Sequence, residues 1–590
     1  MRDLFLADSN GSCWSLNPAT VDTNANLVRG AGRLLAAFLA AAVLAACGSE
    51  KPPAISIQAI QSAAVEAGGS VELTVAAENT GIVWPQSVDG SYEINGNRVI
   101  YTPPAKEGQY AFTVAASADP SLLATATVQV FEPPVPEISS FTLGSLGTGI
   151  IDQYANTITF STHEWINDLG ALKAEFSAVG EVTIAGAAQI SGTTPNDFHR
   201  DVVYTVATGQ FARRSYTVSV VSPQTTGLPI VKIDTKDGAP IQSKEDYLKT
   251  NIEIIDPSHP EFNVSHLDYK DEVRGRGNTT WTYAKKPYRI KFNKKTSLFG
   301  LEAAKSWVLL ANYQDPTLML TSVTMELGHR FGLPFTNHVR HVEVFLNGEY
   351  QGSYALTEQV QVGAGRVEID EERGFLVELD SYYDEEPKFT TAVFQLPVMI
   401  KSPEDLADPS GYDFVKESLN LLETAMSGAA FPDGGYRNLV DMDVFVDYLL
   451  INEIVGNGEL HWPKSTYMYK DAGGKIGMGP LWDFDWAFSY AGGHQYFTGT
   501  DYLISKHPFF KRFLDDPVFV AKYKSRWSQM REEVASIPEF IEQLAGQLWK
   551  SEVQNFWKWP ETRNNGFARE ISDLKEWWSG RVEYLDMAIG

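Results

Sequence analysis

The spacing of apolar residues changes near residue 223, and this change constrains the fold more than any other feature. Before it, apolar and polar residues alternate in short runs such as 70–76 (SVELTVA) and 216–221 (YTVSVV). Such alternation predicts half-buried antiparallel strands. After it, apolar residues spaced by three and four predict helices over 509–513, 518–530, 537–557 and 567–589. A chain of 590 residues with both patterns therefore predicts several domains rather than one core.

A proline-rich segment divides the alternating region into two modules. Residues 132–136 (EPPVP) are typical of a stiff, extended linker. We expect a β-sandwich over 54–131, which resembles bacterial immunoglobulin-like repeats, and a second small β-sandwich over 137–222. Neither module carries clustered His, Asp or Glu, so we interpret both as spacers, with weak glycan binding as the alternative. The fold class expected is two all-β modules followed by an α+β unit over 228–590.

The amino-terminal 47 residues have the pattern of a targeting segment. Residues 34–46 (LLAAFLAAAVLAA) are too short to span a bilayer but suit a secretory signal core. The following Cys47 completes a Leu-Ala-Ala-Cys sequence that resembles a bacterial lipobox. This predicts a lipid anchor at Cys47 and a place in the bacterial cell envelope, at the outer membrane or cell surface. The alternative is a buried alanine-rich helix. Residues 1–27 are unsuited to a signal, so we expect translation to begin near Val28.

Charge and missing motifs exclude several classes of protein. The chain has 48 Lys and Arg against 74 Asp and Glu, a net charge of −26, which argues against nucleic acid as a partner. Its two cysteines exclude a cysteine-rich metal site. The sequence has no G-x-S-x-G, H-E-x-x-H, Walker or C-x-x-C pattern. The sequence therefore argues against the commonest classes of hydrolase, zinc protease and nucleoside triphosphatase.

Two neighbouring segments of the α+β unit suit an anion. Residues 274–281 (RGRGNTTW) combine glycines with two arginines, so backbone N–H groups and guanidinium groups can both approach a phosphate. A simple hairpin turn would look the same. Residues 285–292 (KKPYRIKF) alternate apolar and basic side chains, as in a strand with one basic face. A sheet edge protected by charge is the alternative.

The next elements follow in an informative order. A helix is predicted over 318–331, with Glu326 near its middle. Strands are predicted over 341–346 and 350–360, joined by an Asn347-Gly348 turn, a strong hairpin signal. Glycine loop, basic strand, helix with a central acid, then hairpin is the order of a protein-kinase amino-terminal lobe.

Two carboxylates stand among aromatic residues farther along the chain. Asp483 and Asp485 lie in the sequence GPLWDFDWAF, where charges are costly unless they are paired or bound to metal. Carboxylate oxygens are the ligands that Mg²⁺ prefers. An extended backbone would point both side chains toward one ion. Capping or salt-bridged aspartates are the alternative.

The α+β unit resembles the spore coat protein H (CotH) kinase family. The resemblance rests on RGRGNTTW, KKPYRIKF, KSWVLLANYQDPTLM, VFLNGEYQGSYALTEQV, NEIVGN, STYMYKD and GPLWDFDWAF, which occur in the expected order. It implies a reduced protein-kinase-like fold and transfer of the γ-phosphoryl of ATP, with Mg²⁺ or Mn²⁺, to an unidentified protein acceptor. Some relatives are surface invasins, so a non-catalytic surface adhesin is an alternative, as is a glycan-binding envelope protein.

The resemblance also implies roles for individual residues. Asp483 matches the metal-binding aspartate, Asp485 is its expected partner, and Trp482 is expected to stack on adenine. Glu459 stands where the family usually has the aspartate of Asn-x-Asp. It retains a carboxylate, but a shift of about 1 Å can cost on the order of 100-fold in rate.

The phosphate-binding residues are less sharply defined. The phosphate-binding lysine is either Lys286 or Lys291. We prefer Lys291, with Glu326 as its helix partner, and expect Arg276 and Asn278 to be the loop contacts.

Overall fold

The computed structural model describes residues 5–7, 13–15, 53–58, 60–403, 409–500 and 506–590. Cys47 and most of the predicted signal region lie outside these residues, so the lipid anchor stays a prediction. The first strands described are a short pair, β1 (Phe5–Ala7) and β2 (Cys13–Ser15). Among the described residues, no helix combines the length and the apolar character needed to cross a bilayer.

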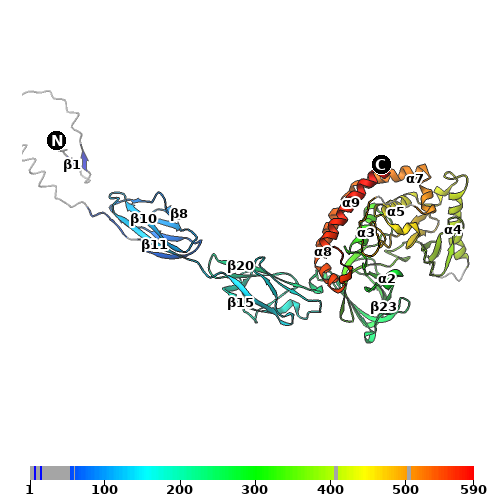
Figure 1. Ribbon diagram of the computed structural model, residues 1–590, viewed down its shortest axis with the longest axis horizontal. Helices are drawn as coiled ribbons and strands as arrows, with labels where there is room; N and C mark the ends of the chain where they lie inside the picture. Colours follow the sequence, from blue (N-terminus) through cyan, green and yellow to red (C-terminus); the bar gives the residue numbers. More distant parts are fainter. Residues whose placement is uncertain (1–4, 8–12, 16–52, 59, 404–408, 501–505) are drawn as a thin grey trace, which may run out of the picture. The chain divides into compact units, whose positions relative to one another are not determined.

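The first β module forms one compact unit with its own core (Figure 1). Its sheets have the orders β4-β11-β10-β7, β5-β9-β8 and β3-β6. Alternate side chains such as Val99, Tyr101, Phe112 and Val114 are buried between them, as the period-two pattern predicts. The strands are β3 (Ser56–Ile57), β4 (Ala63–Glu66), β5 (Val71–Thr74), β6 (Ala77–Glu78), β7 (Ile82–Val83), β8 (Ser91–Asn95), β9 (Arg98–Thr102), β10 (Gly108–Ala116) and β11 (Leu123–Phe131).

The second β module also packs two sheets on an apolar core. The sheets have the orders β12-β15-β18 and β13-β14-β20-β19-β16-β17, and Phe141, Tyr204 and Tyr216 are fully buried between them. The predicted pair of all-β modules is confirmed. The strands are β12 (Glu137–Leu143), β13 (Ile150–Asp152), β14 (Thr157–Ser161), β15 (Leu172–Val179), β16 (Glu181–Ile184), β17 (Ala187–Ala188), β18 (Pro195–Asn196), β19 (Val202–Ala207) and β20 (Arg213–Val221).

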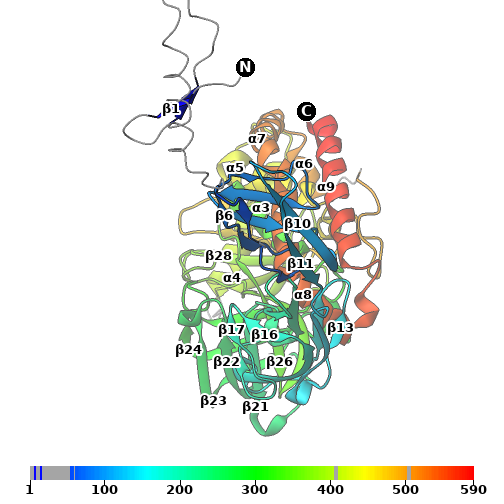
Figure 2. The ribbon, with the colours of Figure 1, turned by 90° about the vertical axis from the view of Figure 1, so that its left-hand side faces the viewer.

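The α+β unit begins with a closed barrel, shown in green in Figure 2. Its strand order is β21-β22-β23-β24-β25-β27-β26. Asn347 and Gly348 both have positive φ, 51° and 80°, which makes the predicted tight turn between β26 and β27. The strands are β21 (Ile230–Thr235), β22 (Leu248–Ile255), β23 (Val264–Gly275), β24 (Tyr288–Thr296), β25 (Ala304–Leu310), β26 (Val339–Leu346) and β27 (Glu349–Glu358).

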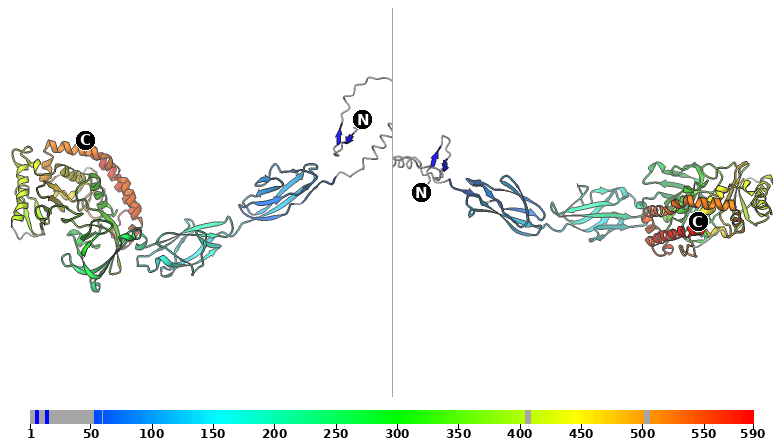
Figure 3. Two further views of the ribbon diagram at one scale, coloured as in Figure 1. Left: turned by 180° about the vertical axis from the view of Figure 1, so that it is seen from behind. Right: turned by 90° about the horizontal axis from the view of Figure 1, so that it is seen from above.

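A second sheet and most of the helices follow the barrel. The sheet order is β29-β30-β28-β31-β32, from Lys388–Thr390, Pro397–Ser402, Phe375–Leu379, Thr466–Lys470 and Ile476–Met478. Helix α5 (Met442–Ile454) is buried on nearly every side, and Figure 3 shows the last helices running along one side of this unit. The other helices are α2 (Thr279–Thr282), α3 (Leu320–Phe331), α4 (Pro409–Ser427), α6 (Pro508–Phe513), α7 (Pro517–Ala535), α8 (Ile537–Lys558) and α9 (Phe567–Ile589).

Apart from Thr208–Ala212, the second β module and the α+β unit belong to one compact body. His163 stacks on Trp557 of α8, with ring centroids 3.4 Å apart. Trp165 meets the edge of Phe345 at 5.5 Å, and Lys232 lies 3.8 Å above the Trp165 ring. The module is therefore part of the packing of the α+β unit, rather than only a spacer before it.

Replacing Trp165 with alanine should destabilise this body. The change removes the contacts with Phe345 and Lys232, so we expect the apparent melting temperature of the full chain to fall by about 3 °C or more. Differential scanning calorimetry measures this. Tyr154→Ala in the same module is the control because Tyr154 is 98% exposed. Equal melting temperatures for W165A and Y154A would contradict the packing role.

Candidate functional site

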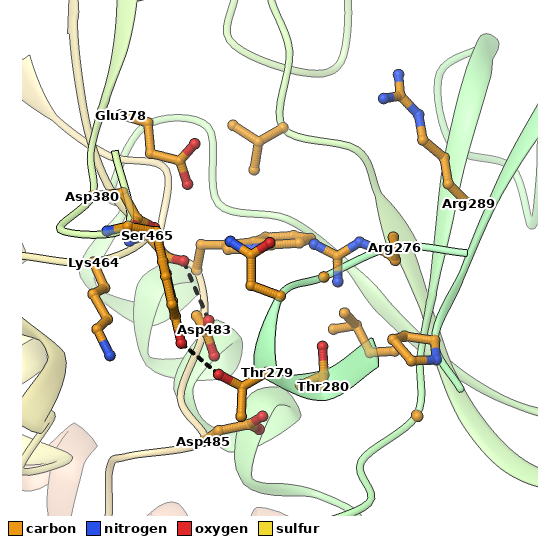
Figure 4. A pocket seen from close by; sticks show the side chains of 18 of the residues that line it. Arg276, Thr279, Thr280, Arg289, Glu378, Asp380, Lys464, Ser465, Asp483 and Asp485 are labelled. Atoms are coloured by element: carbon orange, nitrogen blue, oxygen red, sulfur yellow. Dashed lines mark hydrogen bonds between the residues drawn. The ribbon is translucent and has the colours of Figure 1, made fainter. Parts of the chain in front are cut away.

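A cavity of about 560 Å³ lies beside the barrel and the second sheet. The barrel contributes the loop after β23 and the start of β24. The opposite wall comes from the end of β28, the segment before β31 and the segment 482–486. Figure 4 shows side chains from both sides pointing into this space. Six of the predicted site residues line it, namely Arg276, Asn278, Glu459, Trp482, Asp483 and Asp485.

The barrel side of the cavity is cationic. Arg274, Arg276 and Arg289 line it, and Arg276 lies over the face of Trp482, 5.4 Å from the ring centroid. Burial lowers the pKa of Arg276, and the charge of Asp483 is the largest opposing influence. One face of Trp482, which was expected to stack on adenine, therefore has a guanidinium group above it.

Two glycines allow this loop its shape. A Cβ on Gly275 would lie 2.3 Å from the Trp281 ring, and one on Gly277 would lie 2.1 Å from Thr280 Oγ1. Gly277 also has a φ of 81°, in the region that favours glycine. The glycines thus bring the Arg276 backbone close to its neighbours, where a side chain would not fit.

The opposite wall carries Asp483 and Asp485. Asp483 has a φ of 58°, so the backbone is not extended as we expected, yet both side chains reach the cavity (Figure 4). The hydroxyl of Ser465 donates to Asp483 Oδ2 at 3.2 Å. Burial and the neighbouring Asp483 raise the pKa of Asp485 to about 8. A charge on Asp485 is therefore unfavourable in this buried position beside a second carboxyl group.

Glu459 is placed by a short 3₁₀ helix, Gly458–His461. The Asn457 side chain accepts a hydrogen bond from the Glu459 N–H at 3.1 Å. The Glu459 side chain is buried, and its Oε2 has no hydrogen-bond partner among the described residues. Burial raises its pKa to about 9, with repulsion from Asp483 as the next cause and attraction to Lys464 opposing. A buried, unpartnered carboxyl is costly and suggests a group that an incoming ligand completes.

The structure does not bring three of the predicted residues to the cavity. Lys291 is exposed and lies 3.7 Å from Glu272 Oε2, while Glu326 pairs with Arg330 at 2.8 Å. The expected Lys291–Glu326 ion pair is not formed. Lys286 donates to the backbone oxygen of Trp281 at 2.7 Å. The basic face of β24 was identified correctly, but only its first residue, Arg289, lies near enough to line the cavity.

Other residues of the cavity were missed by sequence reasoning. Asp380 is buried, and burial raises its pKa to about 6. Lys464 lies 3.9 Å from the centroid of the Trp486 ring. Buried Lys285 donates to Asn555 Oδ1 at 2.7 Å, and burial lowers its pKa to about 7. Lys285 stands in the KKPYRIKF segment and Lys464 follows Trp462-Pro463, but no motif marks Asp380.

The cavity offers oxygen ligands for a divalent cation, although not a complete site. Among the described residues, no group of three or more His, Cys, Asp or Glu side chains is arranged to hold a metal. Mg²⁺ is commonly bound through one or two carboxylates together with substrate phosphates. Asp483 and Asp485 supply two such carboxyl groups, and both line the cavity. The residues present therefore fit Mg²⁺ or Mn²⁺ that arrives with a phosphate ligand.

Comparison with protein families gives a decisive result for the unit that holds this cavity. A family model described as CotH kinase protein matches residues 273–585, more than half of the chain. The chain belongs to the CotH kinase family. A second family model, described as SGBP, N-terminal, matches residues 138–220, which are most of the second β module. The CotH match includes the arginine loop, Glu459 and both aspartates of the cavity.

Solved structures resemble the chain only weakly. The M1 domain from titin is 18% identical, with 13% of this chain and 94% of that chain covered and a TM-score of 0.11. The I9–I11 tandem from titin is 12% identical, with 40% and 94% covered and a TM-score of 0.16. The eight N-terminal Ig domains of Down syndrome cell adhesion molecule are 12% identical, with 43% and 35% covered and a TM-score of 0.20. A comparison with curated proteins finds no match.

Glu459→Gln should stabilise this protein at alkaline pH. The folded-state pKa of Glu459 is raised to about 9, so the folded state binds more protons than the unfolded state between about pH 4.5 and 9. This carboxyl thus lowers stability as the pH rises through that window. We expect E459Q to melt at least about 2 °C above the parent at pH 8 and equally at pH 5. Exposed Glu371→Gln is the control, and a pH-independent difference would contradict the assignment.

Proposed function

We propose that the chain is an atypical kinase that transfers the γ-phosphoryl of ATP to a hydroxyl group. The observation that carries this proposal is a single cavity with arginines on its barrel side and two aspartates on the other. Phosphoryl transfer needs positioning and charge neutralisation more than covalent chemistry by the protein. Protein hydroxyls are the acceptors that membership of the CotH kinase family implies.

The barrel arginines are suited to the phosphates. Arg276 and Arg289 supply fixed donors for phosphate oxygens, and Trp482 under Arg276 restricts its guanidinium to the cavity. We assign the nucleotide phosphates to this side, in place of the role first given to Lys291. Asn278 holds Lys244 at 2.6 Å and so places another cation at the rim.

The two aspartates and Glu459 complete the proposed site. Asp483 and Asp485 would hold Mg²⁺ or Mn²⁺, which supplies neutralisation of phosphate charge. Ser465 orients Asp483 through its hydroxyl. Glu459 would accept the proton of the acceptor hydroxyl, and a cation bound nearby lowers its pKa and makes it the carboxylate that this role requires.

A non-catalytic envelope protein is the second candidate. Glu459 in place of aspartate favours an adhesin that retains the fold without activity. The match of 138–220 to an SGBP N-terminal domain favours glycan binding.

Either role agrees with a lipid anchor at Cys47 in the bacterial envelope, which we propose. Incorporation of a labelled fatty acid into the protein tests this anchor, and the Cys47→Ser variant is the comparison.

Asp483→Asn should remove phosphotransfer without unfolding the chain. The change deletes a charge that the proposed cation requires, so we expect autophosphorylation with labelled ATP to fall at least about 100-fold. Exposed Asp413→Asn is the control, and circular dichroism checks that both variants fold. Undiminished labelling of D483N would contradict the kinase assignment.

Arg276→Met should weaken nucleotide binding. Losing the buried guanidinium removes charged hydrogen bonds to phosphate, so we expect affinity for Mg·ATP to fall about 10-fold or more. Thermal-shift titration measures it, because a ligand that binds the native state raises the melting temperature. Arg340→Met, an exposed change in the same barrel, should leave the titration unaltered. The same curve for R276M and the parent would place the phosphates elsewhere.

A further inference from the structure

Three aromatic side chains in the region of this site are exposed to solvent. Tyr382 is 47% exposed, Trp462 is 73% exposed and Trp486 is 40% exposed. Tyr382 and Trp486 line the cavity, and Trp462 follows Glu459 by three residues. The nucleotide binding proposed for the arginine loop and the aspartates does not involve these three rings. Large aromatic surfaces left in water beside a cavity indicate a ligand that covers them.

Backbone hydrogen bonds join the three segments that carry these rings. The N–H of Ser381 donates to the oxygen of Pro463 at 2.8 Å, and the N–H of Gly458 donates to the oxygen of Trp486 at 3.0 Å. The three segments therefore meet at the short helix that carries Glu459. This is the side of the cavity where an acceptor hydroxyl must enter, since the arginines occupy the other side.

Lys464 and Thr279 restrict two of the rings. The Lys464 ammonium lies 3.9 Å from the Trp486 centroid and 5.0 Å from the Tyr382 centroid. The Tyr382 hydroxyl is 2.6 Å from Thr279 Oγ1, one of the hydrogen bonds drawn in Figure 4. Cation–π contacts and this hydrogen bond hold the rings in place before any ligand arrives, which lowers the entropy cost of binding on them.

We propose that the acceptor of this site is a carbohydrate hydroxyl. A pyranose ring presents an apolar C–H face to an aromatic ring and hydroxyl groups at its edge to carboxylates. This side of the cavity offers both groups: the aromatic rings just described and the carboxylate of exposed Asp384, which also lines the cavity. The β module that matches the SGBP N-terminal family belongs to the same compact body. The inference rests on the proposed kinase function and names its substrate class.

The proposed reaction transfers the γ-phosphoryl group of ATP to a sugar hydroxyl, with Glu459 as the base. The sugar oxygen attacks the γ-phosphorus, and its proton passes to the Glu459 carboxylate. A new O–P bond forms while the bond from the γ-phosphorus to the bridging oxygen breaks, and ADP leaves with that electron pair. The product is a sugar phosphate monoester.

The test uses the full chain and compares different acceptors and variants of the exposed aromatic residues. Labelled ATP and Mg²⁺ are supplied with dextran, laminarin, xylan or chitohexaose, and in parallel with casein. We expect at least one glycan to be labelled faster than casein. Trp462→Ala and Tyr382→Ala should each raise the KM for that glycan about 10-fold, with a much smaller change in the KM for ATP. Affinity electrophoresis in gels containing the same glycan gives a second readout independent of catalysis.

Two matched variants separate the rings from general damage. Tyr382→Phe keeps the ring and should retain most glycan affinity, while Trp549→Ala removes a tryptophan of α8 that is 53% exposed and should have no effect. Labelling of casein alone, or retardation by no glycan, overturns the inference but not the kinase function. A parent protein that shows no thermal shift with Mg·ATP and labels no acceptor overturns the kinase function itself. Retardation by a glycan without any labelling overturns the acceptor role and supports a binding role.

Discussion

The electrostatic opposition between Arg276 and the Asp483–Asp485 pair is the interaction on which the account of this protein depends. The guanidinium is packed on Trp482 and faces Asp483 across the cavity. Burial of Asp485, and next the neighbouring Asp483, raise the pKa of Asp485 and make its charged form unfavourable. Charges held in this way are unfavourable without a ligand. The proposed ligand, a cation bound to a polyphosphate, would satisfy both sides at once.

The sequence predicted the fold class well because the periodic patterns are strong. Both β modules, the Asn347-Gly348 hairpin and the carboxyl-terminal helices follow from period-two and three-to-four spacing. The closed barrel did not, since closure depends on β21 pairing with β26 across more than a hundred residues. Periodicity gives the faces of strands but not which distant strands meet.

The site was predicted where a motif carried its own chemistry. The arginine loop and the two aspartates were singled out because glycines with arginines, and carboxylates among aromatic residues, each suggest a ligand, and both motifs line the cavity. Lys291 was misplaced because strand alternation identifies a face but not the distance along it, and Arg289 at the strand start is nearer. Asp380 and Lys464 come from segments that are brought together only by β28 pairing with β31, so no local pattern marked them. The backbone at Asp483 has a left-handed conformation, which the neighbouring residues in the sequence do not predict.

The most direct test of the central claim is a crystal structure of the protein with Mn²⁺ and a non-hydrolysable ATP analogue, in which anomalous scattering locates the metal. The account predicts one anomalous peak within coordination distance of both Asp483 and Asp485, and a triphosphate that contacts Arg276. A peak elsewhere, or a nucleotide that leaves Arg276 and both aspartates without contact, would contradict it.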